Sequence, residues 1–528
     1  MNKQIKTYNI IFFSLVAAAF LFILFSNPFL RLPYDPWDHL LRIASLYDEG
    51  TCFYFWPDNR CPERILWHEL WAYVFKFSEI NDVFVWAKII HVFQFSLASL
   101  IMFYFSKTAL TILTNEKDSI RIKFLSLFSV FLWFIGNGTF PAYQQAWIMW
   151  YSVTHQGLTI PLFWYCTALT LKLFYEDLSF KKIPFFIVQI AGASFLMAKI
   201  HPSELLYYLI ILSTLVLINS VRLIRSKDRK TLLIFIPVIF LMMFVAVKYV
   251  MPQKVPLFSL ISSGETVSQI LQKIKDSGYN IVHGINRLNR FPNSFSEIAI
   301  ISLIAMAIFR VNYLFTKDKD ISFHKNIFDF LLISSTLFFL IPMVPLLAGL
   351  GEYLTTEGGY VVYRFFFASP WFIFLPFAIY KVLTMKEIHM PFYKFIITGI
   401  LILYSVVHFH KYLIPNIVKG NTKSIIASLD KEKVGVQYSK NDIDALRKII
   451  MECEQSSEGK PNMYFTEEKS SVTGGVGDKA YIIRGVFRKY VYGYRRTDLT
   501  EGHFYKRGLD KKYNLIDIDH PEEFRPSN

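Results

Sequence analysis

Long apolar runs recur along most of the chain and are separated by short polar segments. About 20 apolar residues in an α-helix cross the roughly 30 Å hydrocarbon core of a bilayer. The pattern therefore predicts about eleven membrane spans, at 8–29, 83–106, 122–140, 158–176, 183–200, 204–221, 231–250, 296–315, 327–348, 361–380 and 391–412. The shorter apolar stretch 143–156 fits an interfacial or re-entrant helix, or an extension of a neighbouring span.

Two large loops interrupt these runs, at 30–82 and 251–295. In the first loop, apolar and charged residues alternate at helical spacing over Pro36–Tyr47 and over Glu63–Phe77. Helices of this kind lie in the membrane interface, with one face in the lipid and the other in water. We therefore expect two interfacial helices in the first loop.

The segment 413–528 differs in composition, because it is rich in charge and in turn residues. Its pattern predicts a helix over Asp442–Cys453 and strands over Met463–Thr466, Ala480–Ile483 and Tyr513–Ile518. The predicted fold class is thus a predominantly α polytopic membrane domain, 1–412, followed by a small α/β domain, 413–528.

Composition supports a membrane protein: 53% of the residues are hydrophobic and 18% are charged, against about 25% charged in soluble domains. The net charge of +15 does not indicate a nucleic-acid partner, since much of it lies in short loops. If the amino terminus is cytoplasmic, the inside segments carry 19 Lys and Arg in 66 positions, and the outside segments carry 10 in about twice that length. The positive-inside rule therefore places the first loop and the carboxy-terminal segment outside the cytoplasm.

Two of the four cysteines, Cys52 and Cys61, fall in the first loop on either side of a turn-prone segment. This placement predicts a disulfide in an oxidising compartment such as the periplasm, with two unpaired thiols as the alternative. We expect a multi-pass protein of the bacterial cytoplasmic (inner) membrane, with an extracytoplasmic carboxy-terminal domain.

The segment Tyr34-Asp35-Pro36-Trp37-Asp38-His39 follows the first apolar run directly. Carboxylates at a membrane surface can accept a proton from a hydroxyl or hold a divalent cation. Asp35 and Asp38 are therefore candidate catalytic residues, or metal ligands if a cation takes part, and His39 is a candidate substrate-binding residue. The alternative is a helix cap, which Asp35 beside Pro36 fits well.

Other ionisable residues stand at the predicted outer ends of later spans. His201 and Glu204 crowd a short turn where Pro202 breaks the helix, and His155 precedes another span. All three are candidate substrate-binding residues, since a histidine at the membrane edge could bind phosphate or transfer a proton. The alternatives are a capped hairpin, with Lys199 pairing with Glu204, and an ordinary interfacial histidine.

Glu357 and Arg364 bracket the start of the tenth predicted span. An arginine here suits a bidentate grip on a lipid phosphate, or else extends to the interface. The basic, tyrosine-containing segment 479–512 is a candidate surface for sugars or anionic lipid, or a solvated face.

The layout resembles the GT-C superfamily of membrane glycosyltransferases, which use polyprenyl-phosphate-linked sugars. The resemblance is carried by the acidic motif after span one, His201-Pro202-Ser203-Glu204 at a span junction, Tyr363-Arg364-Phe365-Phe366, and the outside carboxy-terminal domain. It implies an inverting transfer of sugar to an envelope glycan, glycolipid or protein, with Asp35 or Asp38 as base or metal ligand. The Trp-Trp-Asp-Tyr-Gly motif of oligosaccharyltransferases is absent, which argues against transfer of whole glycans to asparagine.

Two other classes remain as alternatives. A transporter or flippase of lipid-linked saccharide would bury charges near the middle of the membrane and show paired half-repeats, which the sequence lacks. The other alternative is a non-catalytic envelope scaffold or assembly subunit.

Overall fold

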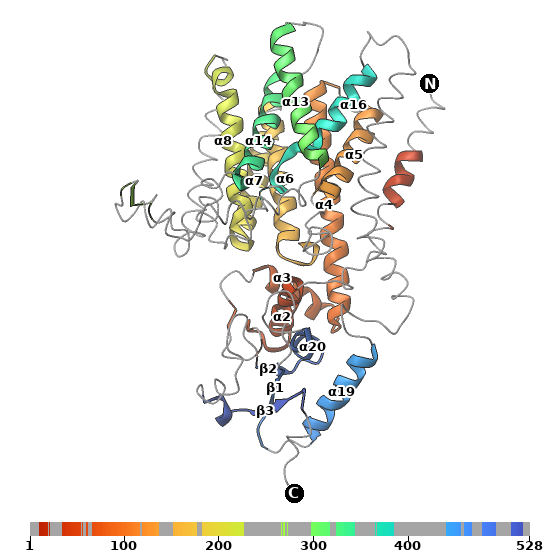
Figure 1. Cartoon of the computed structure of the whole chain (residues 1–528), viewed down its shortest axis with the longest axis vertical. Coiled ribbons are helices and arrows are strands. Elements are labelled where there is room, and N and C mark those ends of the chain that lie inside the picture. Colours follow the sequence, from red (N-terminus) through yellow and green to blue (C-terminus); the bar gives the residue numbers. More distant parts are fainter. Residues whose placement is uncertain are drawn as a thin grey trace. The chain divides into compact units, whose positions relative to one another are not determined.

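The structure, a computed structural model, is mostly helical (Figure 1). Apart from single positions, the residues that it describes are 10–18, 34–53, 66–116, 119–136, 151–176, 182–225, 297–316, 324–343, 367–384, 440–455, 459–466, 478–492 and 508–520. The chain divides into two compact units. One comprises Met1–Phe22, Phe95–Ile148 and Gln156–Asn416, and the other comprises Ile23–Gln94, Met149–His155 and Ile417–Asn528.

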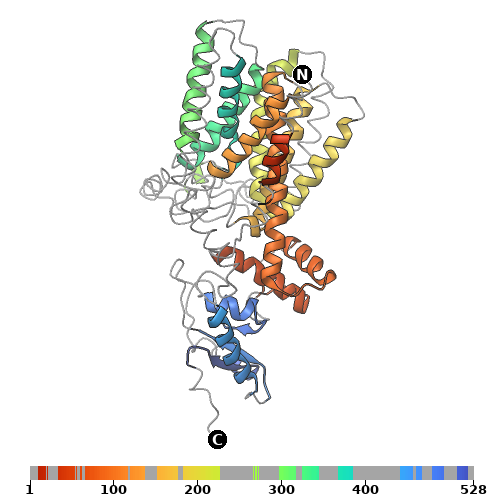
Figure 2. The same cartoon turned by 90° about the vertical axis from the view of Figure 1, so that its right-hand side faces the viewer.

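The first unit is a bundle of apolar helices. It contains the second half of α4 (Val83–Thr114) together with α5 (Ile120–Gly136), α6 (Gln156–Tyr175), α7 (Lys182–Ile200), α8 (Pro202–Arg225), α13 (Glu297–Thr316), α14 (Lys325–Met343) and α16 (Phe374–Thr384). Helices α6, α7 and α8 pack against one another, and α13 packs against α14 and α16 (Figure 2).

Within the described residues, four helices are long and apolar enough to cross a membrane, namely α4, α6, α7 and the Ser203–Ser220 part of α8. These helices confirm four of the predicted spans, and they make the chain a multi-pass membrane protein. Helices α5, α13 and α14 coincide with three more predicted apolar segments. The predicted spans 231–250 and 391–412 lie outside the described residues.

The predicted span 361–380 needs a correction at its start. A short 3-10 helix, η6 (Pro370–Ile373), precedes α16, and Pro370 stands in its first turn. Proline has no backbone N–H to donate and its fixed φ suits the first turn of a helix, so the regular helix follows it rather than running through it.

Two helices of the second unit confirm the helical conformation expected in the first loop, while their interfacial position stays a prediction. They are α2 (Tyr34–Glu49) and α3 (Leu66–Phe77), and they pack against each other. Pro36 is tolerated in α2 because the N–H groups of the first turn have no partner inside a helix. The apolar face of α2 is buried, as Leu40, Leu41 and Ala44 show.

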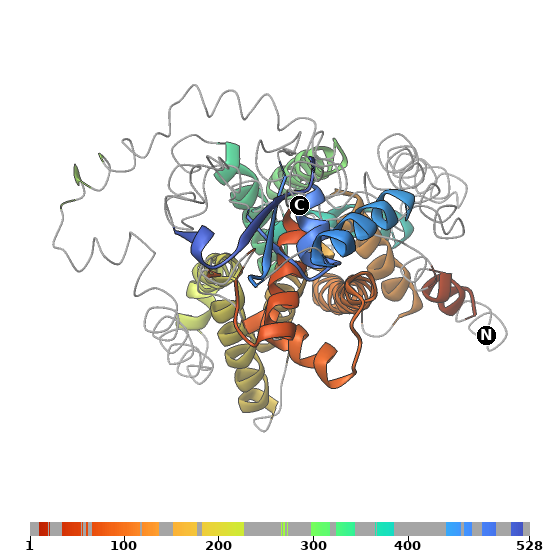
Figure 3. The same ribbon diagram turned by 90° about the horizontal axis from the view of Figure 1, so that it is seen from below.

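The carboxy-terminal segment forms a small α/β fold. Strands β1 (Asn462–Phe465), β2 (Tyr490–Val491) and β3 (Asn514–Asp517) form a parallel sheet in the order β2-β1-β3. Helix α19 (Lys440–Gln455) lies beside the sheet (Figure 3), and the Tyr464 hydroxyl donates to the Ile450 carbonyl in that helix. The helix and two of the three predicted strands are thereby confirmed.

The predicted strand Ala480–Ile483 is wrong, because these residues belong to helix α20 (Asp478–Gly485). A four-residue apolar run does not distinguish a strand from a buried turn of helix. The flanking residues carry the signal: Asp478 opens the segment and Gly485 closes it, as acidic residues and glycine do at the two ends of a helix. Helix α20 forms the crossover that two parallel strands, β1 and β2, require.

Candidate functional site

Asp38 lies on α2 beside Arg42, one helical turn further on. The Arg42 guanidinium donates to Asp38 Oδ2 at 2.7 Å, and the two side chains are only 9% and 3% exposed. An unpaired charge at such a buried site would destabilise the fold by roughly 3–5 kcal/mol. The ion pair is therefore what allows Asp38 and Arg42 to be buried. For Asp35, helix α2 already begins at Tyr34, so its backbone lies within the first turn; its side chain lies outside the described residues.

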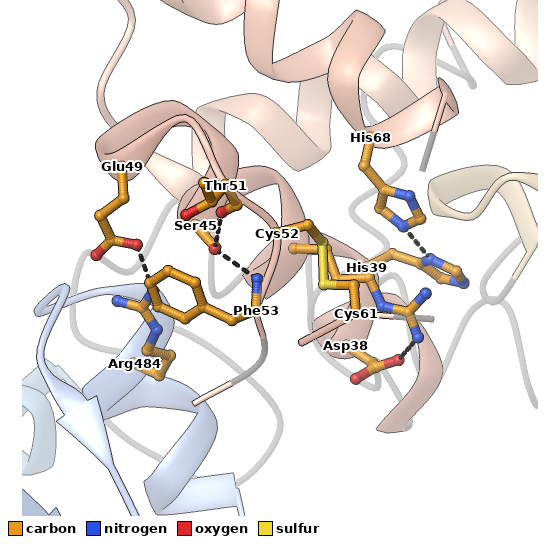
Figure 4. The surroundings of a disulfide bond; sticks show 11 residues. Asp38, His39, Ser45, Glu49, Thr51, Cys52, Phe53, Cys61, His68 and Arg484 are labelled. Carbon is orange, nitrogen blue, oxygen red and sulfur yellow. Dashed lines mark hydrogen bonds and ion pairs between the residues drawn. A yellow bond between two sulfur atoms is a disulfide. The ribbon is translucent and has the colours of Figure 1, made fainter. Parts of the chain in front are cut away.

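His39, the next residue on α2, is the centre of a chain of three imidazoles. His39 Nδ1 lies 2.7 Å from His68 Nε2 on α3 (Figure 4), and His39 Nε2 lies 3.0 Å from His155 Nδ1. His39 and His68 are 3% and 1% exposed, whereas His155 is half-buried. The structure thus brings together two predicted substrate-binding residues, His39 and His155, and adds His68.

The tautomers of these three imidazoles follow from the number of protons that they share. Each N···N hydrogen bond holds one proton, and a neutral imidazole carries one N–H. When all three imidazoles are neutral, their N–H groups therefore all point the same way along the row. The tautomer of His39 then sets the tautomers of His68 and His155. Both ring nitrogens of His39 are already bonded, so this ring serves to orient its neighbours.

The described residues do not form a ready cation site, since among them no three His, Cys, Asp or Glu side chains are grouped so that they could hold a metal. The ring nitrogens of the three histidines bond to one another in pairs, and they do not converge on one point where a cation could sit.

The segment that carries His155 is held by polar residues of α4. The Gln94 amide donates to the carbonyls of Ser152 and Thr154 at 2.7 and 3.0 Å, and His91 Nδ1 lies 2.7 Å from the Ser152 hydroxyl. His91 and Gln94 were not among the site residues predicted from the sequence. The available signal was a pair of polar residues inside an apolar run, which usually have a partner or a function.

His201 and Glu204 meet in the other unit, at the junction of α7 and α8. His201 Nδ1 lies 2.5 Å from Glu204 Oε2, and His201 Nε2 lies 3.3 Å from the Gln156 amide nitrogen. Both side chains are nearly fully buried. A carboxylate on one ring nitrogen fixes the tautomer and orientation of the imidazole. Glu204 therefore orients His201, and the sequence did not indicate this pairing.

The remaining predicted site residues, Glu357 and Arg364, lie outside the described residues. Four basic residues of the segment 479–512 are engaged in ion pairs: Lys479 with Asp519, Arg484 with Glu49, Arg488 with Asp48, and Lys489 with Glu454. These four side chains are thus paired within this unit, and the lipid-binding or solvated face of the segment stays a prediction.

The ion pairs around the end of α2 are partly desolvated. Burial raises the pKa of Glu49, an effect that the positive charge of Arg484 opposes. Burial likewise lowers the pKa of Arg488, which Asp48 opposes. Each group is charged in a place that disfavours charge, and the opposite charge beside it offsets that cost.

The disulfide predicted between Cys52 and Cys61 is present, with a Cα–Cα distance of 5.3 Å. It closes the loop that follows α2 (Figure 4). The Ser45 hydroxyl donates to the Thr51 carbonyl and accepts from the Phe53 N–H, which fastens the loop to the helix.

No protein-family model matches the sequence, and no curated protein is detectably similar to it. Solved structures of an Archaeoglobus fulgidus oligosaccharyltransferase are similar in fold. The zinc and sulfate complex matches with a TM-score of 0.44 and 13% identity over 87% of this chain and 58% of the archaeal chain. The apo form matches with a TM-score of 0.45 and 11% identity over 87% and 60% of the two chains.

A third structure is the archaeal oligosaccharyltransferase AglB from the same organism, in complex with an inhibitory peptide and a dolichol-phosphate. It matches with a TM-score of 0.48 and 12% identity over 91% of this chain. The chain spans about three fifths of the length of these proteins: 58% for the zinc and sulfate complex, 60% for the apo form and 64% for the peptide complex. At 11–13% identity, these matches to the archaeal oligosaccharyltransferase concern the fold, and they extend over 87–91% of this chain.

Proposed function

We propose that this protein is an integral membrane glycosyltransferase that moves a sugar from a polyprenyl-phosphate donor to an acceptor of the cell envelope. The observation that carries the proposal is the buried ionisable cluster on α2, which comprises Asp38, Arg42 and His39 with the imidazoles of His68 and His155. Groups of this kind cost free energy when buried and concentrate at functional sites. The cluster also follows the first apolar run directly, where a lipid head group would meet it.

The proposed reaction needs one base and a cationic environment for the departing phosphate. The acceptor hydroxyl oxygen attacks the anomeric carbon from the face opposite the lipid phosphate, which inverts that carbon. The bond from the carbon to the phosphate oxygen breaks, and its electron pair leaves with the lipid phosphate. The hydroxyl proton passes to a carboxylate, for which Asp38 and Asp35 are the candidates.

The other predicted residues would bind substrate. Arg364 suits the lipid phosphate, since a guanidinium matches two phosphate oxygens. His155 would contribute a hydrogen bond to sugar or phosphate, and His39 would assist by orienting its ring. His201, oriented by Glu204, would contribute another, and Glu357 would bind sugar hydroxyls. We expect the acceptor to be a glycan, a glycolipid or a protein outside the cytoplasm.

The direct test incubates the purified protein with radiolabelled polyprenyl-phosphate sugars and measures the release of lipid phosphate. A transporter, a flippase or a non-catalytic assembly subunit would leave the donor intact. We expect release with the wild-type protein and less than about 1% of it with Asp38→Asn, since loss of a general base costs about 10²–10⁴-fold.

A matched pair of variants separates catalysis from charge balance. In Asp38→Asn the buried Arg42 loses its counter-charge, whereas Asp38→Asn with Arg42→Gln removes both charges together. If Asp38 serves only as the partner of Arg42, the double variant regains activity; if it reacts, the double variant stays inactive. Asp48→Asn, at the exposed end of the same helix, controls for the loss of one carboxylate. Full activity in Asp38→Asn would exclude Asp38 as the base.

A further inference from the structure

Gln94 is fully buried in α4 and uses its side-chain amide on two different segments. Its Nε2 donates to the carbonyls of Ser152 and Thr154, at 2.7 and 3.0 Å. Its Oε1 accepts from the indole Nε1 of Trp67 on α3, at 2.9 Å. Both N–H groups of the amide are therefore engaged, and the oxygen has a partner as well.

These contacts stand directly beside the two ends of the imidazole chain. Thr154 precedes His155, and Trp67 precedes His68. His39 bonds to both histidines, at 3.0 and 2.7 Å. Gln94 thus holds the backbone on one side of His39 and the α3 side chain on the other.

The chemistry at this position is demanding. Two carbonyl oxygens require two donors, and the indole N–H requires an acceptor. A neutral amide provides all three at this size. Glutamate has nearly the same shape but no donor when it is ionised, so its carboxylate would face two carbonyl oxygens without a proton between them. A buried carbonyl left without a donor costs about 1–3 kcal/mol.

We propose that Gln94 is a positioning residue that places His155 against His39. The relevance to catalysis rests on the proposed transferase function, whereas the effect on His155 does not. The segment 151–155 contains one short 3-10 turn, η3 (Tyr151–Val153). Side chains of α4 hold this segment from outside, through the two bonds of Gln94 and the contact of His91 with the Ser152 hydroxyl.

The first test measures His155 itself. Diethyl pyrocarbonate modifies accessible imidazole nitrogens, and peptide mass mapping reads each histidine separately. In Gln94→Glu, full-length and purified in detergent, we expect His155 to react at least threefold faster than in the wild type. The exposed His520 serves as the internal reference. An unchanged rate at His155 would overturn the proposal, whether or not the protein is a transferase.

The second test is a double-variant cycle on lipid-phosphate release. We expect Gln94→Glu to lower kcat/KM at least tenfold in the wild-type background and less than twofold in the His155→Ala background, because the residue acts through His155. A role in general stability would lower kcat/KM equally in both backgrounds, and that result overturns the proposal. If the wild type releases no lipid phosphate, the proposed function fails while the modification test still decides this inference.

Two further variants define the contact that matters. Trp67→Phe removes the indole donor and keeps both bonds to the 151–155 segment, so we expect less than a threefold change at His155 in either test. Gln94→Asn is neutral but one methylene shorter, so it keeps the donors and loses their reach. Where Gln94→Glu lowers the yield of folded protein, Gln94→Asn takes its place with the same expected outcomes.

Discussion

The guanidinium of Arg484 lies 3.3 Å from the carboxylate of Glu49, although 435 positions separate the two residues in the chain. Arg484 is fully buried, and its guanidinium also lies over the rings of Phe53 and Tyr490, at 5.1 and 5.5 Å. One side chain therefore joins the carboxy-terminal α/β fold to the end of α2 and to the disulfide-closed loop. The Val491 N–H adds a backbone bond to the Phe55 carbonyl.

Replacing Arg484 should weaken this junction. In Arg484→Met the buried stem is kept and the charge is lost, so Glu49 stays half-buried without its cation. Loss of one partner of a fully buried pair costs about 3–5 kcal/mol, and partial exposure of Glu49 lowers our expectation to about 1–3 kcal/mol. Denaturant unfolding of the purified protein measures this change. Arg447→Met, which removes an exposed ion pair with Asp444, should cost less than about 0.5 kcal/mol.

The disulfide should stabilise the same region. It links residues nine positions apart, and closing so short a loop lowers the entropy of the unfolded chain by an amount worth about 2–3 kcal/mol. Cys52→Ser with Cys61→Ser should therefore unfold at a lower denaturant concentration, and dithiothreitol should shift the wild type but leave this variant unchanged. Cys453→Ser should keep the wild-type response to reductant, and a loss of that response would contradict the assignment.

Gly485, the last residue of α20, lies close against α2. A Cβ at this position would lie 3.1 Å from Leu41 Cδ2 and 3.8 Å from Trp37 Cζ3. Because the Leu41 methyl is the end of a flexible side chain, Gly485→Ala should cost no more than about 1 kcal/mol, whereas the larger Gly485→Val should cost about 1–3 kcal/mol through overpacking. Thermal unfolding of the two variants gives the comparison, and equal stabilities would show that the helices separate freely here.

Glu454 should make the carboxy-terminal fold sensitive to acid. Burial alone would raise its pKa, but hydrogen bonds from Lys489 and Tyr464 outweigh burial and lower it from 4.5. A carboxyl with a lowered pKa in the folded state stabilises the fold above its unfolded pKa, and this contribution is lost as the pH falls through the folded value. Glu454→Gln should therefore be less stable than the wild type at pH 7, and the gap should close below pH 4.5. A gap that is constant from pH 7 to pH 3 would refute the assignment.

Glu204 should matter through its charge. The carboxylate orients His201 at 2.5 Å, and Glu204→Gln keeps the shape while offering either an acceptor or a donor that does not select the imidazole tautomer. We expect a loss of roughly 10–100-fold in lipid-phosphate release, since a residue that orients a functional imidazole has effects of this size. Ser78→Ala, on an exposed turn, should retain wild-type release. Wild-type activity in Glu204→Gln would assign the pair to structure alone.

Several features followed from local sequence patterns. Apolar length predicted α4, α6, α7 and α8, and helical periodicity predicted α2, α3 and α19, because these signals depend on residues close together in the chain. Two cysteines in one short loop predicted the disulfide for the same reason. The prediction was wrong for α20, where a four-residue apolar run does not distinguish helix from strand.

The contacts of the candidate site depended on residues far apart. Asp38 and His39 stood out because they follow the first apolar run directly. Arg42 stands four residues after Asp38, a spacing that favours an ion pair on a helix, but only the packed structure shows that this pair is buried. His68 lay on an amphipathic helix with no signal to distinguish it, and Gln94 was a polar residue inside an apolar run whose partners the sequence did not show. Their importance lies in what they touch.

By itself the sequence determined that this chain is a multi-pass helical membrane protein with a small α/β fold near its carboxy terminus. Burial of apolar length and the periodicity of local hydrogen bonding are sufficient for that. Only the tertiary structure decided that His39 meets His68 and His155, which lie 29 and 116 positions away, and that Arg484 meets Glu49. These pairings arise because helices bury their apolar faces against each other, and the polar groups carried along must then find partners within reach.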